Sequence, residues 1–483
     1  MINIGPLDVE TSKRVSLQKQ LINRLKQAIL SGRMPAGSRL VPSRLLATEL
    51  GVSRNTVMLA YEHLMAEGYV TANRQGSWVT SLIIPAEHSN KTPKIDSTPV
   101  LMAHRLQSFK EIHSQPVSHT ALLAPGIPSL KDFPLAAWRR SLERAIKQTG
   151  TSSLAYKEAQ GEPSLRQAIA MHLHIARGVR CDASQVIITE GARHALELCV
   201  TLMTNAGDSV WIENPGYQGA RSVFKANDLR IVPIPVDNAG LAIPVRAWHK
   251  HSPKLIYTSP AHQYPTGAVL SVSRRMELIT RAKESGTWII EDDYDGDFRH
   301  VGEPIASMQG LTEDAPVFYI GSFSKTMFPT LRIGFLVLPK NVMLEAQSVL
   351  PELLQGGNQL QQLALSDFIT SGEFGRHLGR MRRLYRERRH VLNEALATHF
   401  PQEKILGGSA GMHLTLKLPT GLDDMKIAKM AHSKGIGVHA LSAFFMKPTH
   451  CDTGLIIGYG NTTADNIPRA VNIIAQLLGT YSK

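Results

Sequence analysis

The sequence is poor in cysteine and has no long apolar run. Only three of its 483 residues are cysteines, Cys181, Cys199 and Cys451, and their spacing fits no metal-binding motif. Scattered cysteines argue against a disulfide framework and favour a reducing compartment, so we expect a cytoplasmic protein. No uninterrupted apolar stretch approaches about 18 residues, and the N-terminus lacks the charged-then-apolar order of a signal peptide. We therefore expect no membrane partner.

Basic residues, in contrast, are in excess. Lysine and arginine number 53 against 40 acidic residues, which gives a formal charge of +13 and a pI near 9.6. This charge fits a nucleic-acid partner, although a recognisable motif is needed to support one. A chain of this length with 43% hydrophobic residues has enough core for two or three domains.

Residues 1–82 show the pattern of three short helices followed by a hairpin. Apolar residues recur at helical spacing after Ser16, and a second helix follows with Ser43 as its expected N-cap. Ser53 is the expected cap of a third helix, and residues 69–79 predict a two-stranded wing. This order is typical of a winged helix-turn-helix, which binds double-stranded DNA.

The segment around the third helix resembles the GntR family of regulators. The resemblance is carried by Leu50-Gly51-Val52-Ser53-Arg54-Asn55-Thr56-Val57 and by Glu67-Gly68-Tyr69-Val70. Side chains at the start of this helix can meet phosphates and base edges, and the second-helix start and the wing tip suit the DNA backbone. The residues expected to contact an operator are Arg44, Ser53, Arg54, Asn55, Thr56, Arg74 and Gln75. A small helical protein-interaction domain is the alternative.

The composition changes between residues 83 and 118. Four prolines are scattered there among Ser, Thr, His and Lys, and apolar periodicity is weak. We interpret this stretch as a semi-extended linker with a helical turn between His104 and Ile112. It separates the DNA-binding domain, residues 1–82, from a larger domain that covers residues 119–483.

A lysine at the end of an apolar strand organises the larger domain. Val317-Phe318-Tyr319-Ile320 predicts a buried strand, and Gly321-Ser322-Phe323-Ser324-Lys325-Thr326 follows it. Poor hydration there lowers the pKa of the Lys325 ammonium group and frees the amine for a Schiff base with an aldehyde. Ser322, Ser324 and Arg332 add groups that suit a phosphate. Together they predict pyridoxal 5′-phosphate (PLP), and a surface loop with an ordinary lysine is the alternative.

Two further strand ends carry matching polar groups. The strand at 287–290 runs into Glu291-Asp292-Asp293-Tyr294-Asp295, where a carboxylate can pair with the pyridine nitrogen of PLP. Tyr294 can reach the phenolic oxygen. The strand at 186–189 leads through Gly191-Ala192-Arg193 into a helix, and a helix N-terminus after a glycine turn binds anions. This turn supplies the other half of the expected phosphate site.

With the turn Ser259-Pro260-Ala261-His262-Gln263-Tyr264-Pro265-Thr266-Gly267, these segments make residues 120–480 similar to a fold-type I aminotransferase. The resemblance implies an α/β fold with a mostly parallel sheet. It also implies a PLP Schiff base on Lys325, with Asp292 at the ring nitrogen and Tyr294 at the phenolic oxygen.

A GntR-like reader joined to an aminotransferase-like domain is the plan of MocR-type regulators, which nearly the whole chain resembles. The resemblance implies a cytoplasmic, head-to-tail homodimer that binds an operator and responds to PLP or an amino compound. Tyr156 would then reach the cofactor phosphate of the partner subunit, and Tyr217 would lie against the pyridine face. A core aromatic is the alternative for Tyr217.

A working aminotransferase with an accessory reader is the competing function. All parts for Schiff-base chemistry are present, but the substrate clamp departs from the family. Aminotransferases generally hold the α-carboxylate with an arginine two residues before a glycine on a late strand, where this sequence has Ile456. Isoleucine cannot replace a bidentate arginine–carboxylate pair, although Arg221 is a candidate substitute. The departure favours sensing over turnover, with vitamin B6 supply or amino-compound metabolism as the regulated process.

Overall fold

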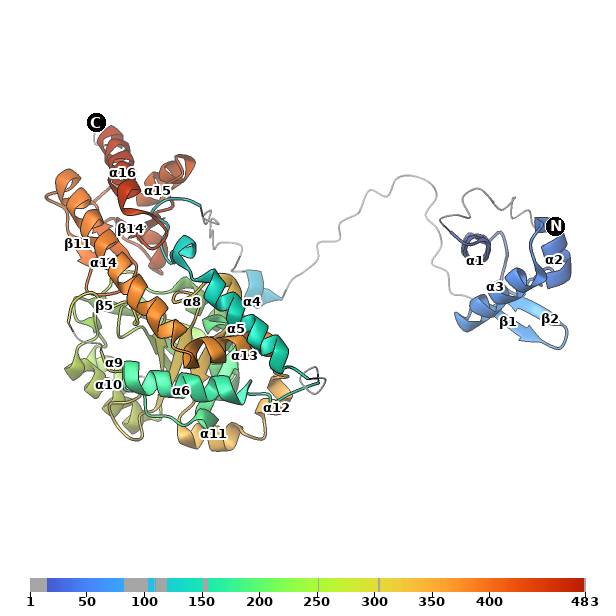
Figure 1. Cartoon of the computed structure of the whole chain (residues 1–483), viewed down its shortest axis with the longest axis horizontal. Helices are drawn as coiled ribbons and strands as arrows, with labels where there is room; N and C mark the ends of the chain where they lie inside the picture. Colours follow the sequence, from blue (N-terminus) through green and yellow to red (C-terminus); the bar gives the residue numbers. More distant parts are fainter. Residues whose placement is uncertain are drawn as a thin grey trace. The chain divides into compact units, whose positions relative to one another are not determined.

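The computed structural model describes residues 15–81, 103–107, 109, 120–150, 155–250, 252–302 and 305–481. The chain divides into two compact units, residues 1–100 and 101–483 (Figure 1). The N-terminal lead and most of the expected linker lie outside the described residues, and the short helix α4 (His104–Gln107) falls where a helical turn was expected. Among the described residues, no helix is both long and apolar enough to span a membrane.

The first unit is a three-helix bundle with an antiparallel hairpin. Its elements are α1 (Leu17–Leu30), α2 (Ser43–Leu50), α3 (Arg54–Ala66), β1 (Val70–Asn73) and β2 (Gly76–Val79). Apolar residues at helical spacing turn toward one core, where Leu21, Val57 and Leu64 are fully buried. The prediction of a winged helix-turn-helix is confirmed.

The helix starts depend on local backbone chemistry. Ser53 is the N-cap of α3, as predicted, and its hydroxyl accepts the backbone N–H of Thr56 at 3.1 Å. The prediction that Ser43 caps α2 is wrong by one residue. Pro42 takes the cap position and Ser43 is already helical. Proline has no N–H to leave unsatisfied and its ring fixes φ, so it suits the residue where a helix begins.

The second unit contains an eight-stranded sheet in the order β3-β10-β9-β8-β7-β4-β5-β6. The five strands from β9 to β5 run parallel, and β10 is antiparallel to both of its neighbours. Its strands are β3 (Val186–Thr189), β4 (Ser209–Asn214), β5 (Arg230–Asp237), β6 (Gly240–Leu241), β7 (Leu255–Thr258), β8 (Trp288–Asp293), β9 (Val317–Ser322) and β10 (Gly334–Val337). The predicted α/β fold with a mostly parallel sheet is confirmed.

Helices cover both faces of this sheet. The helices of this part of the chain are α5 (Leu135–Gln148), α6 (Pro163–Arg177), α7 (Ala192–Met203), α8 (Gln218–Ala226), α9 (Val245–Lys250), α10 (Val272–Ser285), α11 (Lys340–Ala346), α12 (Leu350–Leu353), α13 (Gln359–Thr370) and α14 (Glu373–His399). Alternate residues of one strand enter different cores, so Ile187 packs with residues of α7 and α8 while Val186 and Ile188 join the opposite cluster. Burial on both sides explains why the central strands are continuous apolar runs in the sequence.

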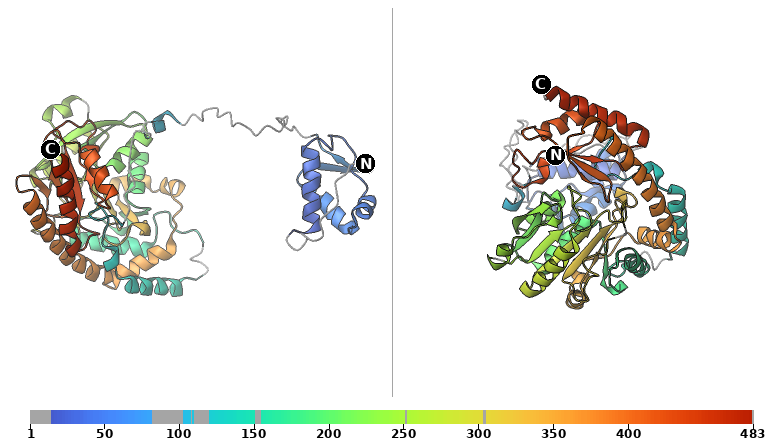
Figure 2. Two further views of the ribbon diagram at one scale, coloured as in Figure 1. Left: turned by 90° about the horizontal axis from the view of Figure 1, so that it is seen from above. Right: turned by 90° about the vertical axis from the view of Figure 1, so that its left-hand side faces the viewer.

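A smaller antiparallel sheet completes the second unit, coloured orange to red beside the green and yellow sheet in Figure 2. It contains β11 (Ile405–Gly407), β12 (His413–Lys417), β14 (Gly454–Gly458) and β13 (His439–Ala440) in that order, with α15 (Asp424–Ser433) and α16 (Ile467–Tyr481). Leu414 and Ile457 join the main core, whereas the hydroxyl of Thr415 donates to the carbonyl of Pro265 at 2.7 Å. One face of this sheet therefore meets the turn after β7.

Candidate cofactor and nucleic-acid sites

Lys325 lies in the loop after β9, with its amine largely buried. The Nζ atom donates a hydrogen bond to the backbone carbonyl of Gly126 at 2.6 Å. A Cβ atom on Gly126, whose φ is +74°, would lie 3.1 Å from this Nζ, so glycine leaves room for the amine. Burial lowers the pKa of Lys325, while Asp295 and Asp292 raise it in part. The direction of this shift is the one that the sequence predicts, and it favours a nucleophilic amine.

Asp292, the second-last residue of β8, is a buried carboxylate with one oxygen that has no partner within the described ranges of the chain. Its Oδ2 accepts the hydroxyl of Tyr257 at 2.6 Å, whereas Oδ1 is buried with no partner among the described residues. Burial raises the pKa of Asp292 to about 7, Tyr257 lowers it, and Asp293 and Glu213 raise it further. A buried oxygen with no donor is costly. The N–H of a protonated pyridine ring would satisfy Oδ1, so this carboxylate fits the cofactor.

The two halves of the predicted phosphate site are brought together by β10, which pairs with both β3 and β9. Gly191 is the N-cap of α7, with Ala192 and Arg193 in the first turn. A Cβ atom on Gly191 would lie 3.7 Å from the guanidinium of Arg332. Ser322 donates to the hydroxyl of Ser324 at 3.0 Å. A helix N-terminus, two hydroxyls and guanidinium groups make a donor set suited to a phosphate.

The two tyrosines of the predicted site differ in exposure. Tyr217 is the N-cap residue of α8 and is 37% exposed. Burial raises the pKa of Tyr217, Asp292 raises it further, and Arg193 and Arg332 lower it, so this ring lies near both ends of the site. Tyr156 is 90% exposed within the single chain.

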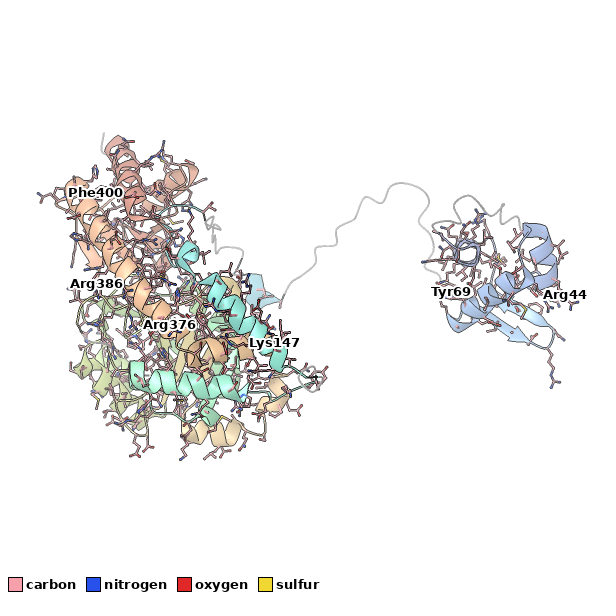
Figure 3. All side chains as sticks on the ribbon, in the orientation of Figure 1. Arg44, Tyr69, Lys147, Arg376, Arg386 and Phe400 are labelled. Carbon is pink, nitrogen blue, oxygen red and sulfur yellow. The ribbon has the colours of Figure 1, made fainter. Side chains whose placement is uncertain are left out.

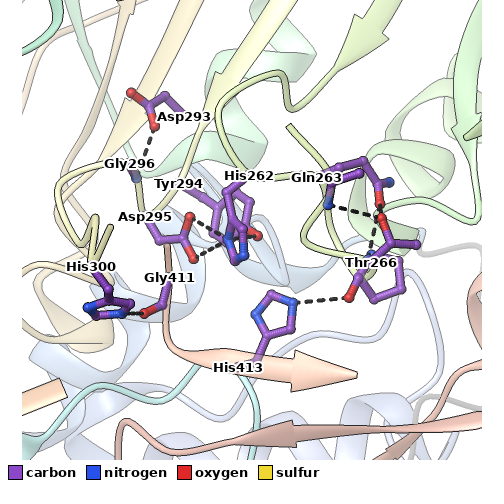
Figure 4. A network of polar contacts seen from close by, with 12 residues as sticks. His262, Gln263, Thr266, Asp293, Tyr294, Asp295, Gly296, His300, Gly411 and His413 are labelled. Atoms are coloured by element: carbon purple, nitrogen blue, oxygen red, sulfur yellow. Dashed lines mark hydrogen bonds and ion pairs between the residues drawn. The ribbon is translucent and has the colours of Figure 1, made fainter. Parts of the chain in front are cut away.

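Tyr294 belongs to a buried polar network that the sequence analysis did not assign (Figure 4). Its hydroxyl lies 3.0 Å from Nδ1 of His262, which also contacts the carboxylate of Asp295. His262 and Asp295 belong to the turn at 259–267 and the segment at 291–295, which the sequence analysis already assigned to the site. The contact between them could not be predicted, because it joins two segments that follow different strands.

An apolar cluster surrounds Ile456, which stands where the sequence resemblance leads us to expect the carboxylate-binding arginine of an aminotransferase. Ile456 is fully buried against Leu441 and Phe444. Arg221, the candidate substitute, donates to the carbonyl of Phe445 at 3.3 Å beside this cluster, and burial lowers its pKa. One N–H group of the Arg221 guanidinium is therefore already used by the backbone carbonyl of Phe445.

The residues predicted to contact DNA lie on the surface of the first unit. Those with exposed side chains are Arg44 (Figure 3), Ser53, Arg54, Asn55, Arg74 and Gln75, and Thr56 is half-buried beside Ser53. Arg39 was missed. Its guanidinium donates to the carbonyl of Gln75 and lies 5.9 Å from the ring of Trp78, so it braces the wing. Arginine–wing contacts join positions 36 residues apart, which sequence spacing does not reveal.

Both units match families of known proteins. The model of bacterial regulatory proteins of the gntR family matches residues 17–79, and the model of aminotransferase class I and II matches residues 122–474. A gntR-type reader and an aminotransferase fold on one chain define a class of DNA-binding transcriptional regulators with a PLP-binding domain. Within that class, the chain belongs to the MocR-type regulators of the GntR family.

Individual relatives cover nearly the whole chain. The probable rhizopine catabolism regulatory protein MocR of Rhizobium meliloti is 34% identical over 461 residues, covering 95% of this chain and 93% of the relative. The HTH-type pyridoxine biosynthesis transcriptional regulator PdxR of Corynebacterium glutamicum is 31% identical and covers 96% of each chain. A solved kynurenine aminotransferase of Pyrococcus horikoshii, in complex with PMP, has a TM-score of 0.69 at 25% identity, covering 80% of this chain and 96% of that chain.

These comparisons support PLP as the cofactor and regulation as the function, rather than turnover with an accessory reader. The MocR and PdxR proteins, which match both parts of this chain, are named as regulators. PLP supplies an electron-withdrawing ring that reacts with amines. The chain supplies a partly buried amine at Lys325, a carboxylate oxygen at Asp292 without a partner among the described residues, and a helix N-terminus at Gly191.

Proposed function

We propose that this protein is a cytoplasmic homodimeric regulator in which occupancy by PLP is the signal, and that the regulated genes concern vitamin B6 supply. The proposed division is a DNA-binding domain at residues 1–82, a linker at 83–118 and a PLP-binding domain at 119–483. The name of the PdxR relative, a pyridoxine biosynthesis regulator, supports this direction. The observation that carries the proposal is the buried Oδ1 of Asp292, which has no partner in the described part of the chain, together with the partly buried amine of Lys325.

The site residues take the following proposed roles. Lys325 forms the Schiff base, Asp292 pairs with the ring nitrogen, Tyr294 meets the phenolic oxygen and Tyr217 lies against the ring. The phosphate is held by Ser322, Ser324, Arg332, Gly191, Ala192 and Arg193, and by the partner subunit's Tyr156 in a head-to-tail dimer. The 90% exposure of Tyr156 in the single chain supports its use by a second copy.

The apolar side chain at position 456 supports the proposal that PLP itself is the signal. An α-amino acid bound here would bring its carboxylate against the apolar side chains of Ile456, Leu441 and Phe444, and isoleucine offers no donor in place of the arginine. Leaving such a group unsatisfied costs on the order of 1–3 kcal/mol, which weakens binding by roughly tenfold to a hundredfold. An amino compound held by Arg221 is the second candidate, because that guanidinium lies beside the same cluster.

A panel of ligands tests this choice of effector. Operator binding of the protein freed of PLP is measured with PLP, with pyridoxal lacking the phosphate, and with α-amino acids at millimolar concentration. We expect PLP to change the affinity at micromolar concentration and the amino acids to leave it unchanged in both the apo and the PLP-loaded protein. A saturable response to an amino acid that is lost in Arg221→Ala would contradict the proposal and support the second candidate.

A further inference from the structure

A buried histidine–aspartate pair stands beside the candidate cofactor site. His262 lies in the turn after β7 and Asp295 follows β8, and each is 2% exposed. Nδ1 of His262 lies 2.9 and 3.1 Å from the two carboxylate oxygens of Asp295, and 3.0 Å from the hydroxyl oxygen of Tyr294 (Figure 4). An ionised carboxylate can only accept a hydrogen bond, so this contact places the hydrogen of the imidazole on Nδ1.

This tautomer fixes the direction of the hydroxyl hydrogen of Tyr294. Because Nδ1 carries its single hydrogen toward Asp295, it has no lone pair to accept the hydroxyl of Tyr294, and the hydroxyl hydrogen is free to meet a different acceptor. Nε2 of His262 then carries a lone pair and no hydrogen. This atom is buried without a hydrogen-bond partner among the described residues, so no donor or acceptor there requires the other tautomer. Burial raises the pKa of Tyr294 well above its ordinary value, so the phenol stays protonated.

We infer that His262, held by Asp295, is a positioning residue that presents the hydroxyl hydrogen of Tyr294 to the phenolic oxygen of bound PLP. This inference rests on the proposed placement of PLP between Asp292 and Lys325. PLP bound here would present a negatively charged phenolic oxygen to the hydroxyl of Tyr294. A donor from Tyr294 would stabilise that negative charge, and would therefore lower the pH at which bound PLP changes its absorbance.

The charged and titratable groups around this pair come from several elements packed against it. They are Asp292, Asp293, Glu213, Tyr264, Lys325, His413, His300 and Tyr459. Burial lowers the pKa of His300 to about 4 and that of His413 well below its ordinary range, so neither imidazole is charged near pH 7. Burial raises the pKa of Asp295, His262 and Lys325 lower it, and Asp293 raises it. The hydrogen bond from His262 thus favours the carboxylate form that the tautomer requires.

Absorbance titration of the full-length, PLP-loaded protein against pH tests the inference. The variants are His262→Gln and the matched control His262→Asn, because an asparagine amide can stand near the position of Nδ1 whereas a glutamine amide stands near Nε2. We expect the spectral midpoint to rise by about one pH unit in His262→Gln and by less in His262→Asn. In a Tyr294→Phe background, His262→Gln should add no shift, because the hydroxyl through which it acts is gone.

Equal shifts with and without the Tyr294 hydroxyl would show a merely structural role and overturn the inference, as would an unshifted His262→Gln protein that retains PLP. Should His262→Gln not fold, Asp295→Asn carries the same comparison, since a neutral amide holds the Nδ1 hydrogen less strongly than a carboxylate. Borohydride labelling of the same samples separates two kinds of failure. Label on Lys325 with an unshifted midpoint refutes only the role of His262, whereas wild-type protein without label refutes the cofactor placement and the inference with it.

Discussion

Replacing Lys325 by alanine is expected to abolish the visible absorbance band of the PLP-loaded protein while leaving it folded. The Nζ atom is the proposed point of covalent attachment, so its loss leaves no amine at the site. The structural cost is small, because Lys325 makes one hydrogen bond, to the carbonyl of Gly126, worth on the order of 1 kcal/mol. The surrounding core consists of apolar strand residues, among them Ile320 and Leu336, which the substitution leaves in place.

Borohydride reduction followed by peptide mapping identifies the lysine to which PLP is attached. Reduced wild-type protein should carry the pyridoxyl group on Lys325, and the variant should carry none. Lys340→Ala, at an exposed helix start, is the matched control and should keep both the band and the label. Circular dichroism and gel filtration check that the variant retains its fold and oligomeric state. A label found on a different lysine would refute the assignment.

Combined alanine substitution of Arg44, Arg54 and Arg74 is expected to remove most operator binding. These exposed arginines lie at the start of α2, the start of α3 and the tip of the wing. Each phosphate contact that is lost should make the slope of log affinity against log salt shallower by about one unit, so the triple variant should lose about three.

Fluorescence anisotropy with a fragment upstream of the gene, at several salt concentrations, gives these slopes. Arg139→Ala changes an exposed arginine of the second unit that is paired with Glu143, and it serves as the charge-matched control for each single variant. The three single variants should each show part of the effect. Should all three bind like the wild type across the salt range, the DNA-binding surface would lie elsewhere.

Much of the fold was predictable because burial leaves a local record in the sequence. The strands that end at Thr189, Asp293 and Ser322 are apolar runs followed by polar residues, and the parallel sheet gathers those ends at one edge. The helix N-terminus at Gly191 follows from a glycine between a strand and a helix pattern. The misplaced cap at Ser43 arose because a serine before a helix pattern indicates a cap more often than the proline that precedes it.

Contacts between strands leave no such local record. Tyr257 satisfies one oxygen of Asp292 from the neighbouring strand, and sequence periodicity marks that tyrosine only as buried. The link between His262 and Asp295 likewise joins two turns that are brought together by β7 and β8. The apolar surroundings of Ile456 come from residues 441–444, which only the folded antiparallel sheet places beside it.

Linkage between PLP and operator DNA is the most direct test of the central claim that cofactor occupancy is the signal. The affinity of the full-length apo-protein for PLP is measured with and without saturating operator, and the affinity for operator is measured with and without saturating PLP. If PLP favours one DNA-binding state, both ratios must differ from one, and thermodynamic reciprocity requires them to be equal. We expect equal ratios of roughly five- to a hundredfold, the usual range for such coupling. A PLP affinity that operator DNA leaves unchanged, in a protein that binds both, would contradict the account.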